Sequence, residues 1–165
     1  MELKDQIELV RQLDTGRFYP PASDSDIEKL LSSIPEMPVE LVTVLKCFNG
    51  EIHSGTPVFG EAFFMSSHTI IEHQKMFNEF EFEEDENYLF EDNDPEYCEK
   101  IRNVLYDPRW IPFMDLDGIV SFMDLNPTTS GVKGQIFSMD IGGGCYFVEY
   151  DAVSLAEYID NNMPA

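Results

Sequence analysis

The sequence predicts an α+β fold in which a mainly antiparallel sheet is flanked by helices. Two observations lead to this expectation. The first half of the chain has apolar residues at helical spacing, and the second half has short strand-like segments separated by turns, followed by a capped helix. The 165 residues suit one domain with a core of its own, and no linker or internal repeat interrupts them. We therefore expect a single domain over residues 1–165.

Four helices are predicted in the first half of the chain. The first has Leu3, Ile7 and Val10 inward and ends before Gly16. The second opens with the capping box Ser25-x-x-Glu28, has Ile27, Leu30, Leu31 and Ile34 on one face and stops at Pro35. The third has Pro38 in its first turn and is closed by Asn49-Gly50, and the fourth is capped by Ser67 and runs through Phe77. A Phe- and Val-rich run from Pro57 to Met65 predicts a strand, with Gly60 as a candidate bulge.

The segment from residue 79 to residue 99 is very acidic, because eleven of its twenty-one residues are Asp or Glu. It opens with Phe80 and Phe82 alternating with glutamates. This alternation is typical of an edge strand with one buried face, and it also fits apolar contacts offered to a partner beside carboxylates. Asp94-Pro95 is expected to begin a further helix, with Tyr97, Ile101, Val104 and Leu105 inward.

The last third of the chain predicts an antiparallel meander. Strands are expected over Trp110–Phe113, Gly118–Leu125, Gln135–Met139 and Cys145–Tyr150. The segments between them contain Gly, Asn-Pro and Asp-Gly sequences, which suit tight turns. The capping box Ser154-x-x-Glu157 then predicts a final helix with Leu155, Tyr158 and Ile159 inward.

The formal net charge of -22 comes from 32 acidic and 10 basic side chains. Such a surface repels nucleic acid and anionic lipid, and it favours encounter with a basic partner. Acidity also keeps a protein soluble, and the charge alone does not separate these roles. The chain has no apolar signal segment and no apolar run of about 18 residues. Cys47, Cys98 and Cys145 are widely spaced, as buried free thiols are, and we expect a cytoplasmic protein.

The sequence pattern does not indicate catalysis or metal binding. His68 and His73 are five residues apart, whereas histidine pairs that bind a metal on a helix are usually four apart. Cys47 is expected on an apolar helix face without an adjacent base. The three aspartates at positions 115, 117 and 124 suit a turn better than a calcium loop, which needs further acidic ligands. We expect no catalytic residue, no cofactor and no metal.

Two groups of motifs occur in a characteristic order. The first runs from Ile34-Pro35-Glu36-Met37-Pro38 to Phe48-Asn49-Gly50. The second comprises Trp110-Ile111-Pro112-Phe113, Asp117-Gly118, Met123-Asp124-Leu125-Asn126-Pro127, Gly134-Gln135-Ile136-Phe137 and the helix after Ser154. This order resembles the SUKH superfamily, the domain of cell-wall-assembly regulators of the Smi–Knr type and of many bacterial immunity proteins. The resemblance covers roughly residues 24–160, and the acidic stretch at 79–99 is an elaboration of this chain.

The resemblance implies a SUKH-like α+β fold and a binding role. Many bacterial members of the superfamily look like antidotes to a secreted or contact-delivered toxin, often a nuclease. We therefore expect a non-catalytic acidic protein, an immunity protein that occludes the active site of a basic toxin. The alternative is a regulatory or scaffold protein of the cell-wall-assembly-regulator type with no toxin partner.

A basic protein is the expected partner, and neither nucleic acid nor a membrane is expected. The residues expected to bind it are Glu83, Glu84, Asp85, Glu86, Glu91, Asp92, Asp94, Asp117 and Trp110. Trp110 is the only tryptophan and lies between two prolines, Pro108 and Pro112. This position fits a core residue, a cleft wall or a platform for a ligand.

Overall fold

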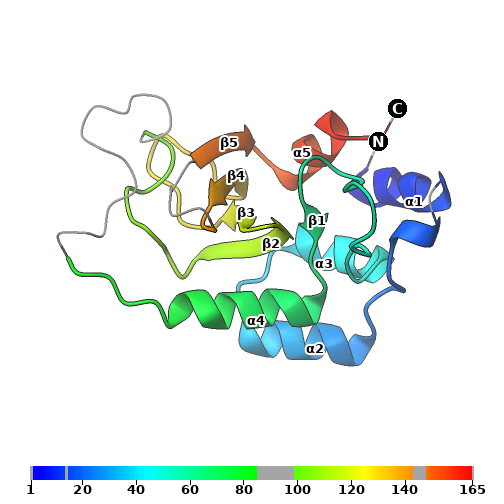
Figure 1. The fold of residues 1–165 in the computed structure, drawn as a ribbon, viewed down its shortest axis with the longest axis horizontal. Coiled ribbons are helices and arrows are strands. Elements are labelled where there is room, and N and C mark those ends of the chain that lie inside the picture. Colours follow the sequence, from blue (N-terminus) through cyan, green and yellow to red (C-terminus); the bar gives the residue numbers. More distant parts are fainter. Residues whose placement is uncertain (1, 14, 85–98, 143–147, 165) are drawn as a thin grey trace.

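The structure of the chain is a computed structural model that describes residues 2–13, 15–84, 99–142 and 148–164. Within these residues, five α-helices and one short 3-10 helix surround a five-stranded sheet, so the predicted α+β fold is confirmed (Figure 1). The helices are α1 (Leu3–Leu13), η1 (Thr15–Arg17), α2 (Asp24–Ser33), α3 (Val39–Cys47), α4 (Ser67–Asn78) and α5 (Leu155–Asn161).

Two helices, α2 and α4, start one or two residues earlier than expected. Helix α2 is capped by Ser23, whose hydroxyl accepts from the backbone N–H of Asp26 at 3.1 Å, while the Asp26 carboxylate accepts from the Ser23 N–H at 3.0 Å. The capping box predicted at Ser25 is therefore wrong by two residues. Ile27, Leu30 and Ile34 are buried as predicted, whereas Leu31, which was expected on the same face, is 41% exposed. The cap of α4 is Ser66, one residue before the expected Ser67.

The sheet is a meander in which each strand pairs antiparallel with its neighbour in sequence, as predicted. Its strands are β1 (Phe63–Phe64), β2 (Trp110–Leu116), β3 (Ile119–Asp124), β4 (Gln135–Asp140) and β5 (Val148–Ala152). Strand β5 ends two residues later than expected, and its expected start at Cys145 falls within residues 143–147, which lie outside the described part of the chain. Strand β1 is far shorter than the predicted Pro57–Met65, because Gly60 turns the chain with a φ of 82°.

Two other predicted elements are absent from the residues described. Residues 99–105 form turns and bends and no helix, while residues 94–98 of the predicted helix lie outside the described ranges. The Lys100 carbonyl accepts hydrogen bonds from the distant Thr128 N–H at 3.2 Å and from the Gln135 side chain at 2.9 Å. These long-range bonds replace the hydrogen bond that this carbonyl would accept within a helix. Phe80 and Phe82 follow the end of α4 without forming a strand, and the Phe80 ring packs edge-on against Phe77.

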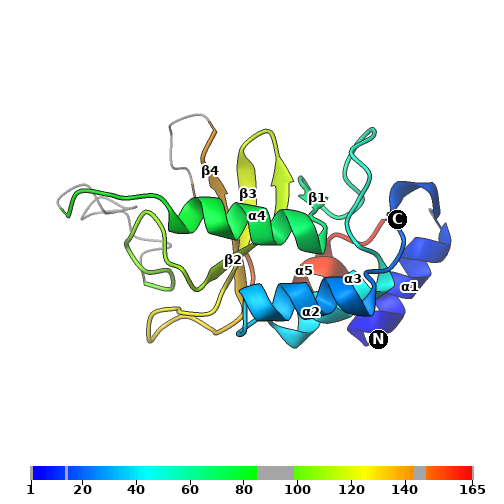
Figure 2. The ribbon, with the colours of Figure 1, turned by 90° about the horizontal axis from the view of Figure 1, so that it is seen from below.

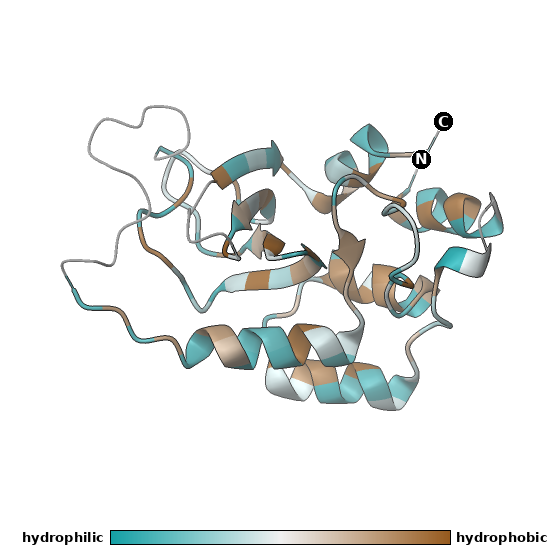
Figure 3. Cartoon of the chain, viewed as in Figure 1, coloured by the Kyte–Doolittle hydropathy of each residue, from teal (hydrophilic) through white to brown (hydrophobic). Residues whose placement is uncertain are grey.

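Helices cover the sheet in two groups (Figures 1 and 2). Helix α4 packs on β2 with α2 beside it, while α1, α3 and α5 contact one another at the β1 end of the molecule. Hydrophobic and hydrophilic residues alternate along most elements, as amphipathic packing requires (Figure 3). The core contains two groups of aromatic rings in contact. One group is formed by Phe18, Phe48, Phe59, Phe64 and Phe113, and the other by Phe77, Phe122, Phe137 and Trp110.

Candidate functional site

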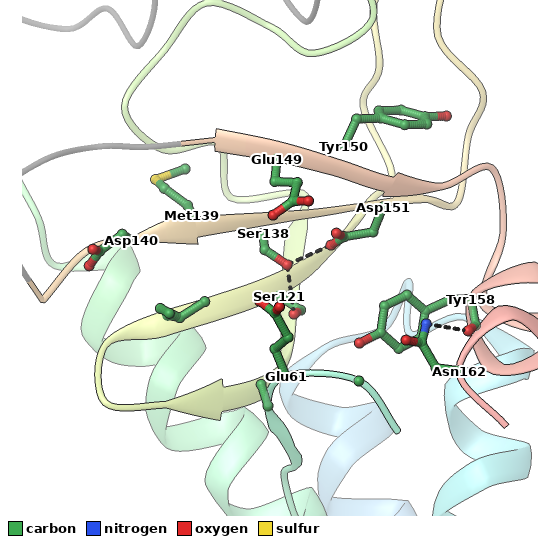
Figure 4. Close-up of a pocket in the computed structure, with 13 residues that line it drawn as sticks. Glu61, Ser121, Ser138, Met139, Asp140, Glu149, Tyr150, Asp151, Tyr158 and Asn162 are labelled. Atoms are coloured by element: carbon green, nitrogen blue, oxygen red, sulfur yellow. Dashed lines mark hydrogen bonds between the residues drawn. The ribbon is translucent and has the colours of Figure 1, made fainter. Parts of the chain in front are cut away.

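An acid-lined hollow of about 470 Å³ lies where strands β3, β4 and β5 meet helix α5 and the segment before β1 (Figure 4). We call it the acidic hollow. Its four carboxylates are Glu61, Asp140, Glu149 and Asp151, and its other polar groups are Ser121, Ser138, Tyr158 and Asn162. None of the described residues that line it is basic. A concave site with converging carboxylates suits a positively charged group.

Strand register explains why these side chains come together. Side chains two residues apart on a strand point to the same face, so Glu149 and Asp151 of β5 share one face. Across the ladder, Ser138 pairs with Glu149 and Ser121 pairs with Ser138. Figure 4 shows Glu149 and Asp151 directed toward Ser138, while the intervening Tyr150 points away.

The two serines and Asp151 form a directional chain of hydrogen bonds. The Ser138 hydroxyl donates to Oδ2 of Asp151 at 2.5 Å. Because a hydroxyl has only one proton to donate, Ser138 must accept from the Ser121 hydroxyl, which lies 3.0 Å away. Both hydroxyl protons of this hydrogen-bond series therefore point toward the Asp151 carboxylate. Ser121 is buried, and this holds the series in place.

The electrostatics of the hollow favour a bound cation. Burial raises the pKa of Asp151 to about 6, and the hydrogen bond from Ser138 opposes this increase. The negative charges of Glu149 and Glu61 raise the pKa further. An ammonium or guanidinium group entering the hollow would relieve this repulsion and stabilise the charged form of Asp151.

Tyr158 of α5 and Gly60 form the opposite wall. The Tyr158 hydroxyl donates to the carbonyl of Phe59 at 3.2 Å, and burial raises its pKa above the ordinary value for tyrosine. Gly60 has a φ of 82°, and a Cβ at this position would lie 2.4 Å from the Tyr158 hydroxyl oxygen. Only glycine combines this backbone conformation with so close an approach.

The residues that the sequence analysis predicted to bind the partner do not line the acidic hollow. Glu83 and Glu84 are exposed after the end of α4, and Asp117 is exposed in the turn between β2 and β3. Asp85, Glu86, Glu91, Asp92 and Asp94 lie outside the described residues. Trp110 is 0% exposed and lies in the core, so this structure does not present it as a platform for a ligand.

A second group of polar residues, around Asp124, is buried and structural. Asp124 accepts from the backbone N–H of Asn126 and from Nε2 of Gln135, both at 2.8 Å. Oε1 of Gln135 in turn accepts from the Val132 N–H at 3.0 Å. The aspartate that the sequence assigned to a turn therefore ties the loop after β3 to the start of β4.

The remaining candidates for chemistry are dispersed. Nδ1 of His73 lies 3.1 Å from the Thr69 carbonyl, and its Nε2 lies 4.0 Å from Asp115. Cys47 is a buried free thiol whose pKa is raised by burial and, to a smaller extent, by Glu8. In the part of the chain that the structure describes, no group of three or more His, Cys, Asp or Glu side chains could hold a metal ion. The described helices include none long and apolar enough to cross a membrane.

Sequence reasoning missed the acidic hollow although one local signal was present. Glu149-x-Asp151 on a predicted strand, opposite Ser138, has the period of two that places both carboxylates on one face. The contribution of Glu61 has no local signal, because Glu61 precedes β2 by almost fifty positions in the chain and reaches the hollow only through the fold.

Helices that precede an antiparallel meander, with a last helix closing the chain, define an α+β domain of the SUKH type. A family model described as "SMI1 / KNR4 family (SUKH-1)" matches residues 21–161, which is most of the chain. The chain belongs to this family, as the motif order indicated. A comparison with curated proteins gave no match.

Proposed function

We propose that the protein is a non-catalytic binding protein for a basic partner. More specifically, we propose an immunity protein that neutralises a basic, nuclease-type toxin by covering its active site. The observation that carries this proposal is the acidic hollow, a concave site with four carboxylates on a chain of net charge -22. Its membership of the SUKH-1 family supports a role in protein binding.

The chemistry of a nuclease suits this site. An enzyme that binds nucleic acid presents lysine and arginine side chains to phosphate groups. The carboxylates of the hollow would take the place of the phosphates, and each cation that enters the hollow would gain charge-assisted hydrogen bonds. Glu149 and Asp151 reach the hollow from β5, and Glu61 reaches it from the segment before β1, so an incoming side chain meets carboxylates from two parts of the chain (Figure 4).

The acidic stretch has a different part in the proposal. Glu83, Glu84, Asp85, Glu86, Glu91, Asp92 and Asp94, with Asp117, would attract the partner from a distance. Long-range attraction raises the association rate, whereas close, desolvated contacts determine how long a complex lasts. We assign the first role to the stretch and the second to the hollow.

The experiment uses the protein encoded by the neighbouring open reading frame, expressed as its toxic domain. Plasmid cleavage is measured with an equimolar amount of the wild-type chain, of the hollow variant (Glu61→Gln, Glu149→Gln and Asp151→Asn) or of a control variant. The control carries Glu2→Gln, Glu28→Gln and Glu72→Gln, three exposed carboxylates outside the hollow, so its net charge changes equally.

We expect the wild-type and control chains to abolish cleavage. The hollow variant should bind more weakly by on the order of 100-fold, because loss of several desolvated charge contacts costs a few kcal/mol. Full cleavage in the presence of the wild-type chain would contradict the immunity role. A basic partner that binds through the hollow but has no toxic activity would favour the regulatory alternative.

A further inference from the structure

A second concave site lies at the start of α5, the helix that also lines the acidic hollow with Tyr158. It is a groove of about 380 Å³ between the α2–α3 junction, the end of β3 and the start of α5. Its floor is apolar, with Met37, Met123, Leu125 and Leu155, which are all buried. Methionine side chains are flexible, so a floor with two of them adapts to the shape of an inserted group.

One exposed valine lines this groove and two more are next in sequence to lining residues, and we call it the valine-rimmed groove. Val39 lines it and is 76% exposed. Val132 and Val153, each next in sequence to a lining residue, are 50% and 44% exposed. Single exposed apolar residues are ordinary on a protein surface. Three around one apolar groove form a patch of the kind that marks an interaction site.

Charge identifies the occupant. Glu36 and Glu40 line the helical side of the groove, and Lys133 lines the opposite side. The Glu36 carboxylate is 3.1 Å from Nε of Arg109, whereas Glu40 forms no ion pair with any residue that the structure describes. A second copy of the chain would also carry a net charge of -22, so repulsion opposes self-association. A basic partner avoids this repulsion and supplies a cation to Glu40.

The groove and the hollow fit a single interface. Ser121 lines the hollow and Met123 lines the groove, and these residues are two apart on β3, so they share one face of the strand. Helix α5 begins at the groove with Leu155 and reaches the hollow with Tyr158, a separation of about one helical turn. An interface of ordinary size, about 800 Å² on each partner, spans both sites.

We propose that the valine-rimmed groove receives an apolar side chain of a basic partner protein, with a neighbouring lysine or arginine of that partner placed against Glu40. This inference rests on the proposed function for the basic character of the partner, and it does not require the partner to be a toxin. The groove supplies apolar burial, which the carboxylates of the hollow do not provide.

The test uses the full chain labelled with ¹⁵N and three short synthetic peptides. One contains lysine and leucine, one contains lysine and serine, and one contains glutamate and leucine. We expect the lysine–leucine peptide to shift the amide signals of Val39, Val132 and Val153. The lysine–serine peptide should shift signals of the hollow alone, and the glutamate–leucine peptide should bind at least tenfold more weakly than the first.

A variant and a matched control make the result specific. Replacing Val39, Val132 and Val153 by serine should weaken binding of the lysine–leucine peptide by at least tenfold. The same replacement at Leu9, Leu31 and Met76, which are also exposed apolar residues, should leave binding unchanged. All six side chains are exposed, so both variants are expected to fold, and circular dichroism checks this expectation.

Three outcomes would overturn the inference: groove signals that do not move with the lysine–leucine peptide, equal binding of the glutamate–leucine peptide, or equal loss in the control variant. A wild-type dimer in sedimentation that the valine variant disperses would assign the groove to a second copy and also overturn it. Because the peptides replace the toxin, the plasmid-cleavage test of the immunity role succeeds or fails separately.

Discussion

Trp110 and Asp124 face each other as cross-strand partners at one end of the β2–β3 pair, and both side chains are fully buried. Burial raises the pKa of Asp124, while bonds from Gln135 and from the Asn126 N–H oppose this effect. Among the residues that the structure describes, the Trp110 Nε1 has no partner at standard hydrogen-bond geometry. The tryptophan thus packs beside a buried carboxylate whose hydrogen bonds come from Gln135 and Asn126.

Removal of the Asp124 carboxylate should destabilise the fold strongly. Asp124→Ala leaves Gln135 and the Asn126 N–H without their acceptor, and we expect a loss of about 3 kcal/mol in the free energy of unfolding. Asp124→Asn, which keeps one acceptor oxygen, should lose about 1 kcal/mol. Urea denaturation measures both. An Asp124→Ala protein as stable as the wild type would show that these contacts contribute nothing.

Asp151 should make stability depend on pH. Its pKa is about 6 in the fold and 3.8 ordinarily, so the folded chain binds this proton more tightly than the unfolded chain. The wild type therefore loses stability relative to Asp151→Asn as the pH rises from about 4 through 6. Since Asp151 is partly exposed, we expect Asp151→Asn to gain about 1–3 kcal/mol at pH 7.5 and almost nothing at pH 4.

The control for this prediction is Glu28→Gln, which removes one exposed charge outside the hollow. It cancels the general effect of net charge on stability, because both variants change that charge equally. Urea denaturation of the three proteins at the two pH values gives the comparison. A gain in Asp151→Asn that is independent of pH, or that Glu28→Gln matches, would refute an effect specific to Asp151.

Gly60 and Tyr158 should behave as a coupled pair. Gly60→Ala combines a φ of 82° with a Cβ only 2.4 Å from the Tyr158 hydroxyl, and we expect a loss of about 2 kcal/mol or more. Tyr158→Phe removes the hydroxyl and its bond to Phe59, at a cost of about 1 kcal/mol. The double variant should lose less stability than the sum of the two single losses, because the close contact between Cβ and the hydroxyl is gone while the backbone strain at position 60 remains. Strictly additive losses would argue against the contact.

The purified protein should have no hydrolytic activity of its own. The fold separates the residues that were considered for catalysis, because Cys47 is buried in α3 whereas His73 lies on α4 beside Asp115. Phosphodiester, ester and peptide substrates provide the assay. An activity that Cys47→Ala or His73→Ala abolishes, with circular dichroism unchanged, would contradict the non-catalytic proposal.

The elements with strong local signals were predicted well. The strands that begin at Trp110, near Gly118 and at Gln135, and the helix capped by Ser154, combine turn residues with regular apolar spacing, and they occur as expected. The strand expected at Pro57–Met65 was predicted from its Phe and Val content alone. Such a composition indicates burial and not strand pairing. Phe59 and residues 62–65 are buried, but only Phe63 and Phe64 pair with β2.

The choice of cap and the composition of the hollow required the structure. Ser23 and Ser25 are both suitable cap residues, and only the backbone path shows that Ser23 bonds to Asp26. The hollow joins Glu61 to Ser138 and Asp151, which are far apart in the sequence. A strand period identifies which residues share a face, but it does not identify what covers that face.

Binding kinetics with the protein of the neighbouring open reading frame test the central claim most directly. Association and dissociation rates are measured by stopped flow at about 0.1 M and about 1 M salt, where the Debye length falls from about 10 Å to about 3 Å. The wild-type chain, the hollow variant and an acidic-stretch variant with Glu83, Glu84, Asp85 and Glu86 changed to their amides are compared.

We expect wild-type association to slow steeply as salt rises, and dissociation to change much less. The acidic-stretch variant should associate slowly even at low salt and dissociate like the wild type, whereas the hollow variant should dissociate faster by on the order of 100-fold. Association that is insensitive to salt, together with a hollow variant that dissociates like the wild type, would contradict recognition of a basic partner by the acidic hollow.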